Sequence, residues 1–268
     1  MQMPPLASAW EPTRLTLQKY AHAMTALPRA GAPEDKRWSH VSLHPTSLGH
    51  GGTGFATAAT PLADGTDLVT TLDIDHHQIV VTAGTDRIAM DLVPGPSPHS
   101  IGTAIADLAS DHGSTFEVDA ARYEDTEELA YEQWHAKAWH DNTVWVADTF
   151  AILNTGVEGE TAGPHIWPHG FDVATEWFGT TVVGEGEAAA NSQIAVGFYP
   201  AGDAYFYANP WPFTDSWAAT PLPDGAIWHV DGWQGAMLPA TNLDDSDERE
   251  QVLVFARAVH DLAHAALR

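Results

Sequence analysis

Histidine is the most abundant acid–base residue that this sequence could use near neutral pH, with 15 copies in 268 residues. Imidazole is both a common metal ligand and a general acid or base, so either chemistry is open to these side chains. We predict that His165 acts as acid–base catalyst or metal ligand and that Asp172 orients it. His40 and His77, which lie in or beside strand-like segments, are predicted as further polar groups of the same site.

The spacing of the histidines limits where a metal ion could bind. His40 and His44, like His165 and His169, are four residues apart in strand-like sequence, which separates them by about 13 Å. Neither pair can therefore bind one ion unless the chain bends, but histidines from distant segments could converge. We predict a divalent metal site from His40, His165 and Asp172. The alternative is that these histidines are half-buried sheet residues bonded to the backbone.

A second histidine pattern, His260-Asp261-Leu262-Ala263-His264, lies in a predicted helix. The spacing places both rings on one helix face, as in the zinc-protease motif H-E-x-x-H. Aspartate is shorter than the glutamate of that motif, and four residues are left to supply a further ligand. The pattern is more typical of histidines near a helix C-terminus, where the helix dipole favours positive charge.

Tryptophan is the second unusual feature, with 11 copies. Several lie beside proline or glycine in strand or irregular segments, where a rigid ring can form the wall of an apolar pocket. We predict that Trp167, Trp177 and Trp211 line a cleft next to the histidine site. The alternative is that each ring fills the core, with its N–H bonded to a carbonyl group.

Charge and cysteine content exclude several classes of function. The 36 acidic residues outnumber 11 basic ones, giving a formal charge of −25, so nucleic acid and anionic membranes are not expected as partners. A neutral or cationic small molecule is the expected ligand. The absence of cysteine excludes disulfides and thiolate metal sites. We expect a cytoplasmic protein, because no secretory signal or long apolar run is visible.

The acidic surface also suggests adaptation to high salt. Carboxylates are spread along the chain, and only three lysines accompany them. Salt would screen the repulsion between these charges. We therefore predict a halophilic or halotolerant source; an ordinary acidic cytosolic protein is the alternative.

The hydrophobic periodicity predicts alternating groups of helices and strands. Apolar residues at helical spacing indicate helices over 10–27, ended by Pro28, and over 100–112, 126–153 and 247–267. Alternating apolar residues indicate strands over 67–74, 79–82, 87–92, 171–178, 193–199 and 204–208. Residues 180–192, rich in glycine and alanine, are predicted as a loop.

Strands that come in groups, rather than alternating singly with helices, favour an α+β fold with mainly antiparallel sheets flanked by helices. The order of elements repeats, which suggests two structurally related halves, residues 1–113 and 114–268. A single continuous domain is the alternative.

Four segments resemble a bacterial family known only as a domain of unknown function, DUF5996. They are Trp38–Leu43, His77–Val81, His165–Phe178, and Gly197–Tyr207 with its aromatic residues. The resemblance covers most of the chain and implies no activity or cofactor. The family pattern emphasises six positions, which are Trp38, His40, His77, His165, Phe171 and Asp172. We therefore add Trp38 and Phe171 to the predicted ligand-binding residues Trp167, Trp177 and Trp211.

The sequence departs from the pattern of that family at two places. Relatives carry a His-Glu pair where Ser192 and Gln193 stand, and an arginine where Trp177 stands. Any chemistry that depends on those groups is in doubt for this chain. We therefore keep two functions: an enzyme acting on a small non-anionic molecule, and a non-catalytic small-molecule binding or regulatory module. The third possibility is an interaction or structural protein without a pocket.

Overall fold

The computed structural model describes residues 2–35, 37–186, 189–244 and 246–268, which fold as two compact units. The N-terminal unit comprises Pro5–Val144 and His165–Phe171, and the C-terminal unit comprises Met1–Pro4, Trp145–Pro164 and Asp172–Arg268. The predicted boundary between residues 113 and 114, and the predicted relationship between the halves, stay predictions.

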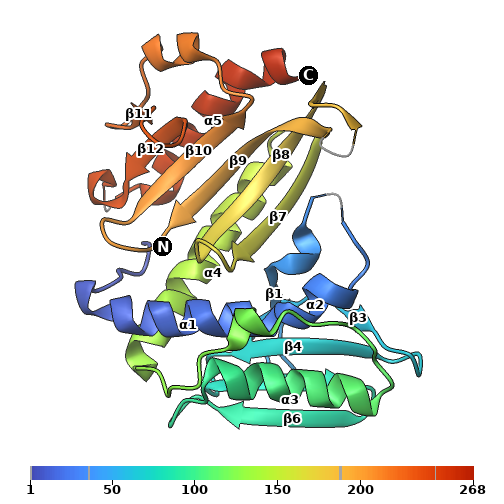
Figure 1. The fold of residues 1–268 in the computed structure, drawn as a ribbon. Coiled ribbons are helices and arrows are strands. Elements are labelled where there is room, and N and C mark those ends of the chain that lie inside the picture. Colours follow the sequence, from blue (N-terminus) through green and yellow to red (C-terminus); the bar gives the residue numbers. More distant parts are fainter. Residues whose placement is uncertain (1, 36, 187–188, 245) are drawn as a thin grey trace. The chain divides into compact units, whose positions relative to one another are not determined.

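The fold class is the predicted one, since antiparallel strand pairs and helices make up both units (Figure 1). In the N-terminal unit, the strands are β1 (Leu43–Ser47), β2 (Thr53–Thr57), β3 (Thr60–Pro61), β4 (Asp67–Asp73), β5 (Gln78–Ala83) and β6 (Asp86–Asp91). They pair in the order β1-β2-β4-β5-β6, with β3 on β4. On the other side of β1, Leu43 pairs with Ile166 of β7 (Glu160–Trp167).

Two helices cover this sheet, α1 (Glu11–Met24) and α3 (Pro98–Asp111), which contact each other (Figure 1). The predicted strand 67–74 is confirmed: its alternate residues are buried, and the turn 83–86 joins β5 to β6. The core of the unit is apolar and comes from helices and strands alike. Its fully or almost fully buried members include Leu17, Tyr20, Leu68, Leu72, Ile79, Val81, Ile101 and Ile105.

In the C-terminal unit, the strands are β8 (Asp172–Val183), β9 (Ala190–Tyr199), β10 (Tyr205–Trp211), β11 (Ile227–His229) and β12 (Gly235–Pro239). They pair in the order β11-β12-β10-β9-β8. Helix α5 (Glu248–Leu267) contacts β8, β9 and β10 (Figure 1). The predicted helix 247–267 is therefore confirmed. Val252, Phe255 and Val259 of its predicted buried stripe are fully buried, whereas Leu262 is half-buried and Ala266 is exposed.

Two predicted helix boundaries are wrong. Pro28 does not end the first helix: α1 ends at Met24, and Pro28 lies in the first turn of α2 (Ala26–Gly31), where proline is tolerated. The helix predicted over 126–153 begins only at Gln133, as α4 (Gln133–Thr155). Before the start of this helix, the carboxylate of Asp125 accepts the N–H of Glu127 and pairs with Lys19.

The loop predicted over 180–192 is also wrong in part. Strand β8 continues to Val183 and β9 begins at Ala190, with Val182 opposite Asn191 across a register shift. The β8 extension consists of Thr180, Thr181, Val182 and Val183, whose β-branched side chains favour strands, whereas the glycines at 184 and 186 lie outside it. Residues 187–188 of the predicted loop lie outside the described residues. Among the described helices, none combines the length and the apolar character that crossing a membrane requires.

Candidate functional site

A pocket in the N-terminal unit brings together two of the predicted aromatic residues and four basic side chains. Its volume is about 230 Å³. That is below the range of about 300–1,000 Å³ found for drug-sized ligands, so it suits a smaller molecule. We call it the basic pocket; its lining is His22, Arg29, Trp38, Val41, Arg122, Trp167, Pro168 and His169.

Trp38 stands on a strained loop. Its backbone has a φ of +62°, unusual for a bulky residue, and its carbonyl accepts the N–H of Val41 at the start of a short 3₁₀ turn. The side chain is 56% exposed. His40 contacts this loop: its Nδ1 accepts the N–H of Asp35, and its ring stacks near that of Trp38, 6.0 Å between centroids. The predicted catalytic residue His40 therefore supports the pocket wall.

Trp167 and His169 reach the pocket from the end of β7 and the turn after it. Helix α1 holds this turn, because the side-chain amide of Gln18 donates to the carbonyl oxygens of Pro168 and His169. The turn closes where the N–H of Phe171 donates to the carbonyl of Trp167, with Phe171 at a φ of +54°. The unfavourable backbone conformation of Phe171 thus closes the turn that places Trp167 and His169 in the pocket lining.

Three separate helical segments supply the remaining basic groups. His22 comes from α1, Arg29 from α2, and Arg122 from the 3₁₀ helix Ala120–Tyr123. Arg122 Nη2 lies 3.0 Å from His22 Nδ1. Since arginine can only donate, His22 Nδ1 accepts, and its ring is neutral with the proton on Nε2.

The ionisable side chains in the described lining of the basic pocket are all histidines and arginines. Burial lowers the pKa of His22 to about 4, with further lowering by the positive charge of Arg122 and by His169 and Arg29. Burial and Arg29 also lower the pKa of Arg122, against the opposing effect of Asp119. Arg122 Nε is buried and, among the described residues, has no hydrogen-bond partner. No aspartate or glutamate belongs to the described lining.

A buried histidine pair adjoins Trp167. His44 Nε2 lies 3.0 Å from the carbonyl oxygen of Ser39 and must donate to it. His44 Nδ1 is then an acceptor, so the proton in its 3.3 Å contact with His165 Nδ1 belongs to His165. These assignments leave His165 Nε2 as an acceptor. Burial and His165 lower the pKa of His44, which keeps that ring neutral.

The catalytic role predicted for His165 and Asp172 is not tested by this geometry, because the two residues belong to different units. Asp172 belongs to the C-terminal unit, where Tyr207 donates to its carboxylate at 2.5 Å. The structure thus describes no joint geometry for His165 and Asp172. Their catalytic pairing, and the metal site of His40, His165 and Asp172, stay predictions.

The remaining predicted residues lie outside the basic pocket. His77 has a φ of +51° in the turn after β4, and its Nδ1 is hydrogen-bonded to the hydroxyl of Tyr131 at 2.7 Å. Phe171 is fully buried and stacks on Trp139, 5.0 Å between centroids, so it packs in the core. Trp211, 39% exposed, ends β10.

Trp177 is a core residue of the C-terminal unit. Its side chain is 5% exposed, its indole N–H donates to the carbonyl of Glu158, and its ring meets His260 edge-on. The cavity beside it measures about 20 Å³, too small for an organic ligand. Trp177 therefore fits the alternative given above, in which a tryptophan fills the core and its N–H bonds to a carbonyl group.

Sequence reasoning missed His22, Arg29, Arg122 and His169. Helix packing brings His22 and Arg122 together although 100 residues separate them, and no local spacing encodes that contact. One signal was present: in a chain with only 11 lysines and arginines, each arginine is a candidate for a specific role.

The comparisons with known proteins identify a family. The chain matches the model of DUF5996, a family of unknown function, over residues 3–267. No curated protein and no solved structure matches the chain.

Proposed function

The chain belongs to the DUF5996 family, whose function is not established, and we propose from the pocket geometry that it binds a small organic anion. The ligand would carry a carboxylate or phosphate group next to a flat apolar part. The protein would act as a small-molecule binding or regulatory module, the second of the functions predicted from the sequence.

One observation carries the proposal: the basic side chains of the pocket face one another without an acidic residue in the described lining. Positive groups brought together in a half-buried space repel each other, and an anion removes that repulsion. Guanidinium groups bind carboxylate and phosphate through paired charge-assisted hydrogen bonds. The unpartnered Nε of Arg122 is a donor that such an anion can satisfy.

The aromatic walls suit the rest of the ligand. Trp38 and Trp167 line the same space as the basic groups, and both rings can cover a flat apolar surface. A bare inorganic ion would leave these rings uncovered. The proposed ligand therefore has one charged end and one apolar face.

This proposal departs from the neutral or cationic ligand expected from the formal charge of −25. Net charge describes the long-range field of the protein, which salt screens over about 8–10 Å. The ligand in the pocket meets the groups within a few ångströms, and these are basic. Global charge would slow the approach of an anion, while local charge would hold it.

An enzyme remains a second candidate, favoured by the His44–His165 pair. An imidazole whose Nδ1–H is held by a second imidazole presents its other ring nitrogen as a proton acceptor, the group that a general base needs. Trp167 lies 5.2 Å from His165, centroid to centroid, and also lines the basic pocket. Substrate turnover that is lost in His165→Gln, with ligand binding retained, would support this candidate.

The test of the binding proposal compares three ligands of the same shape and different charge. Isothermal titration calorimetry of the full chain would use benzoate, neutral benzamide and cationic benzylamine. We expect benzoate to bind at least tenfold more tightly than the other two. Arg122→Gln should remove this preference, whereas Arg87→Gln, which changes an exposed arginine of β6, should keep it. Equal binding of the three ligands, or unchanged binding in Arg122→Gln, would contradict the proposal.

A further inference from the structure

We propose that His50, Asp73 and His76 form a binding site for a divalent transition metal ion. This cluster, which we call the Asp73 cluster, shares no residue with the described lining of the basic pocket or with the metal site predicted from the sequence. Two hairpin segments supply it: His50 follows β1, Asp73 ends β4, and His76 lies in the turn before β5.

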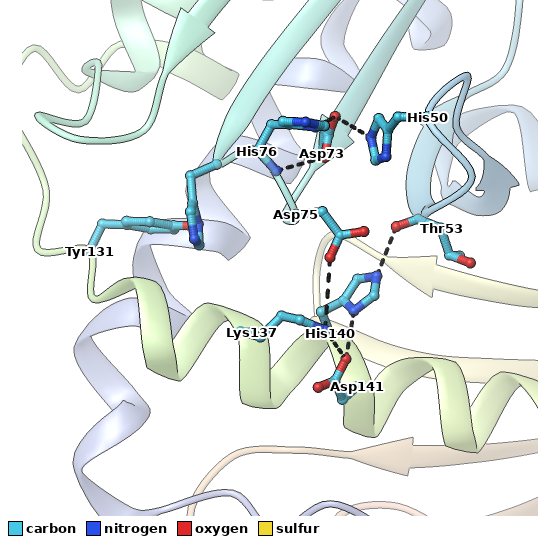
Figure 2. A network of polar contacts seen from close by, with 10 residues as sticks. His50, Thr53, Asp73, Asp75, His76, Tyr131, Lys137, His140 and Asp141 are labelled. Carbon is cyan, nitrogen blue, oxygen red and sulfur yellow. Dashed lines mark hydrogen bonds and ion pairs between the residues drawn. The ribbon is translucent and has the colours of Figure 1, made fainter.

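The three side chains converge on one point (Figure 2). His50 Nε2 and His76 Nδ1 each lie 3.0 Å from the same oxygen, Asp73 Oδ2. All three candidate ligand atoms lie within 4.8 Å of one another. Donors bound at about 2.1 Å around an ion are about 3.0 Å apart at a right angle and about 3.4 Å apart at a tetrahedral angle, so the two 3.0 Å separations are close to those of a bound ion.

The backbone fixes the carboxylate in this position. The N–H of His76 donates to the other oxygen, Asp73 Oδ1, at 3.0 Å. Asp73 is 7% exposed, so its orientation is set by its surroundings. A carboxylate with one oxygen held by a backbone N–H and the other turned toward two imidazoles is the arrangement that a preorganised ligand needs.

The neighbourhood of the cluster requires a glycine and adds a second carboxylate. Gly52 has no side chain, and a Cβ there would overlap both Asp75 Oδ2 and the ring of His50. Asp75 adds a second carboxylate, 3.8 Å from Lys137 Nζ (Figure 2). The two exposed imidazoles can each turn a lone pair to the ion, since their protons can move to the other ring nitrogen.

The chemistry of the donors selects the ion. Two imidazole nitrogens and one carboxylate oxygen suit zinc, iron or cobalt better than calcium or magnesium, which prefer oxygen alone. Three protein ligands leave further coordination positions for water or for a small molecule. Zn²⁺ and Co²⁺ are therefore the probes.

A second histidine–aspartate–histidine cluster, on α5, serves as a comparison. His260, Asp261 and His264 also lie within reach of one another. There, however, His264 Nδ1 lies 3.2 Å from the carbonyl oxygens of His260 and Asp261, so its proton is directed to the backbone. This cluster is the internal control for the Asp73 cluster.

The test is zinc titration of the full chain by calorimetry after treatment with a chelator. We expect one Zn²⁺ per chain, and at least a tenfold loss of affinity in both His50→Gln and His76→Gln. Their side chains are 34% and 54% exposed, and unchanged melting temperatures would show that the fold is kept. Co²⁺ should give visible absorption bands in the wild type that disappear in His76→Gln.

Two control variants make the result specific. His112→Gln removes a histidine that also meets two carboxylates, Asp64 and Asp86, but through opposite ring nitrogens, so that it cannot chelate with them. This variant and His264→Gln should bind zinc as the wild type does. The proposal is overturned if the wild type binds no zinc, if His50→Gln binds normally, or if His264→Gln abolishes binding.

Discussion

The basic pocket and the Asp73 cluster surround their histidines with groups of opposite charge. In the pocket, His22 faces Arg122, and burial with positive charge lowers its pKa to about 4. In the cluster, His50 and His76 face one carboxylate oxygen. The described lining of the pocket contains no acidic side chain, whereas the cluster offers ligands to a cation, although both belong to one unit of an acidic chain. The local neighbours of a side chain, more than the charge of the chain, indicate what a site binds.

The largest expected effect comes from a change that would break both regions at once. Trp139 is fully buried and packs against Phe171 and Phe55 in the core of the N-terminal unit. Trp139→Ala should lower the free energy of unfolding by about 3–5 kcal/mol, as measured by urea denaturation. Trp38→Ala, at an exposed pocket wall, should change it by less than about 0.5 kcal/mol. Similar losses in the two variants would show that Trp38 is a core residue.

The next effect separates the two regions from each other. Arg122→Gln should weaken benzoate binding at least tenfold and leave zinc binding unchanged. His76→Gln should do the reverse. Calorimetry with both ligands on both variants measures this directly, and loss of both ligands in either variant would show that the two regions are not independent.

A smaller effect concerns pH. The pKa of His22 is lowered from its usual 6.5 to about 4, so the unfolded chain binds the proton more readily than the folded one. The stabilising contribution of the neutral ring is complete above pH 6.5 and is lost as the pH falls toward 4. His22→Asn should therefore lose less stability than the wild type between pH 6.5 and 4. Parallel losses in chemical denaturation would contradict the lowered pKa.

The smallest effect tests whether the surface is adapted to salt. If repulsion among the carboxylates opposes folding, added KCl should raise the melting temperature of the wild type by several degrees. The same salt should weaken benzoate binding in the basic pocket, because it screens attraction as well as repulsion. A melting temperature that does not rise with KCl would leave no support for a halophilic source.

Local sequence patterns predicted elements whose residues face a core. Leu68, Thr70 and Leu72 alternate and form β4, and α3 begins after Ser97, whose hydroxyl accepts the N–H of Ser100. The pattern failed where tertiary contacts compete with it. Residues before Gln133 carry helical periodicity but are held elsewhere, since the N–H of Glu132 donates to the hydroxyl of Thr13.

The site was only partly predictable for the same reason. Trp167 could be named because it lies beside a proline, and Trp38 because of the family resemblance, and both line one pocket. Arg122 could not be named, because its role depends on helix packing that brings it to His22. His50, Asp73 and His76 converge through the pairing of β2 with β4, which sequence spacing alone does not encode.

The most direct test of the unbalanced positive charge in the basic pocket is an NMR titration of the His22 imidazole. We expect a pKa near 4 for the protein alone and a clear rise when benzoate saturates the pocket, because the bound anion stabilises the protonated ring. A pKa near 6.5 that does not change with benzoate would contradict the account.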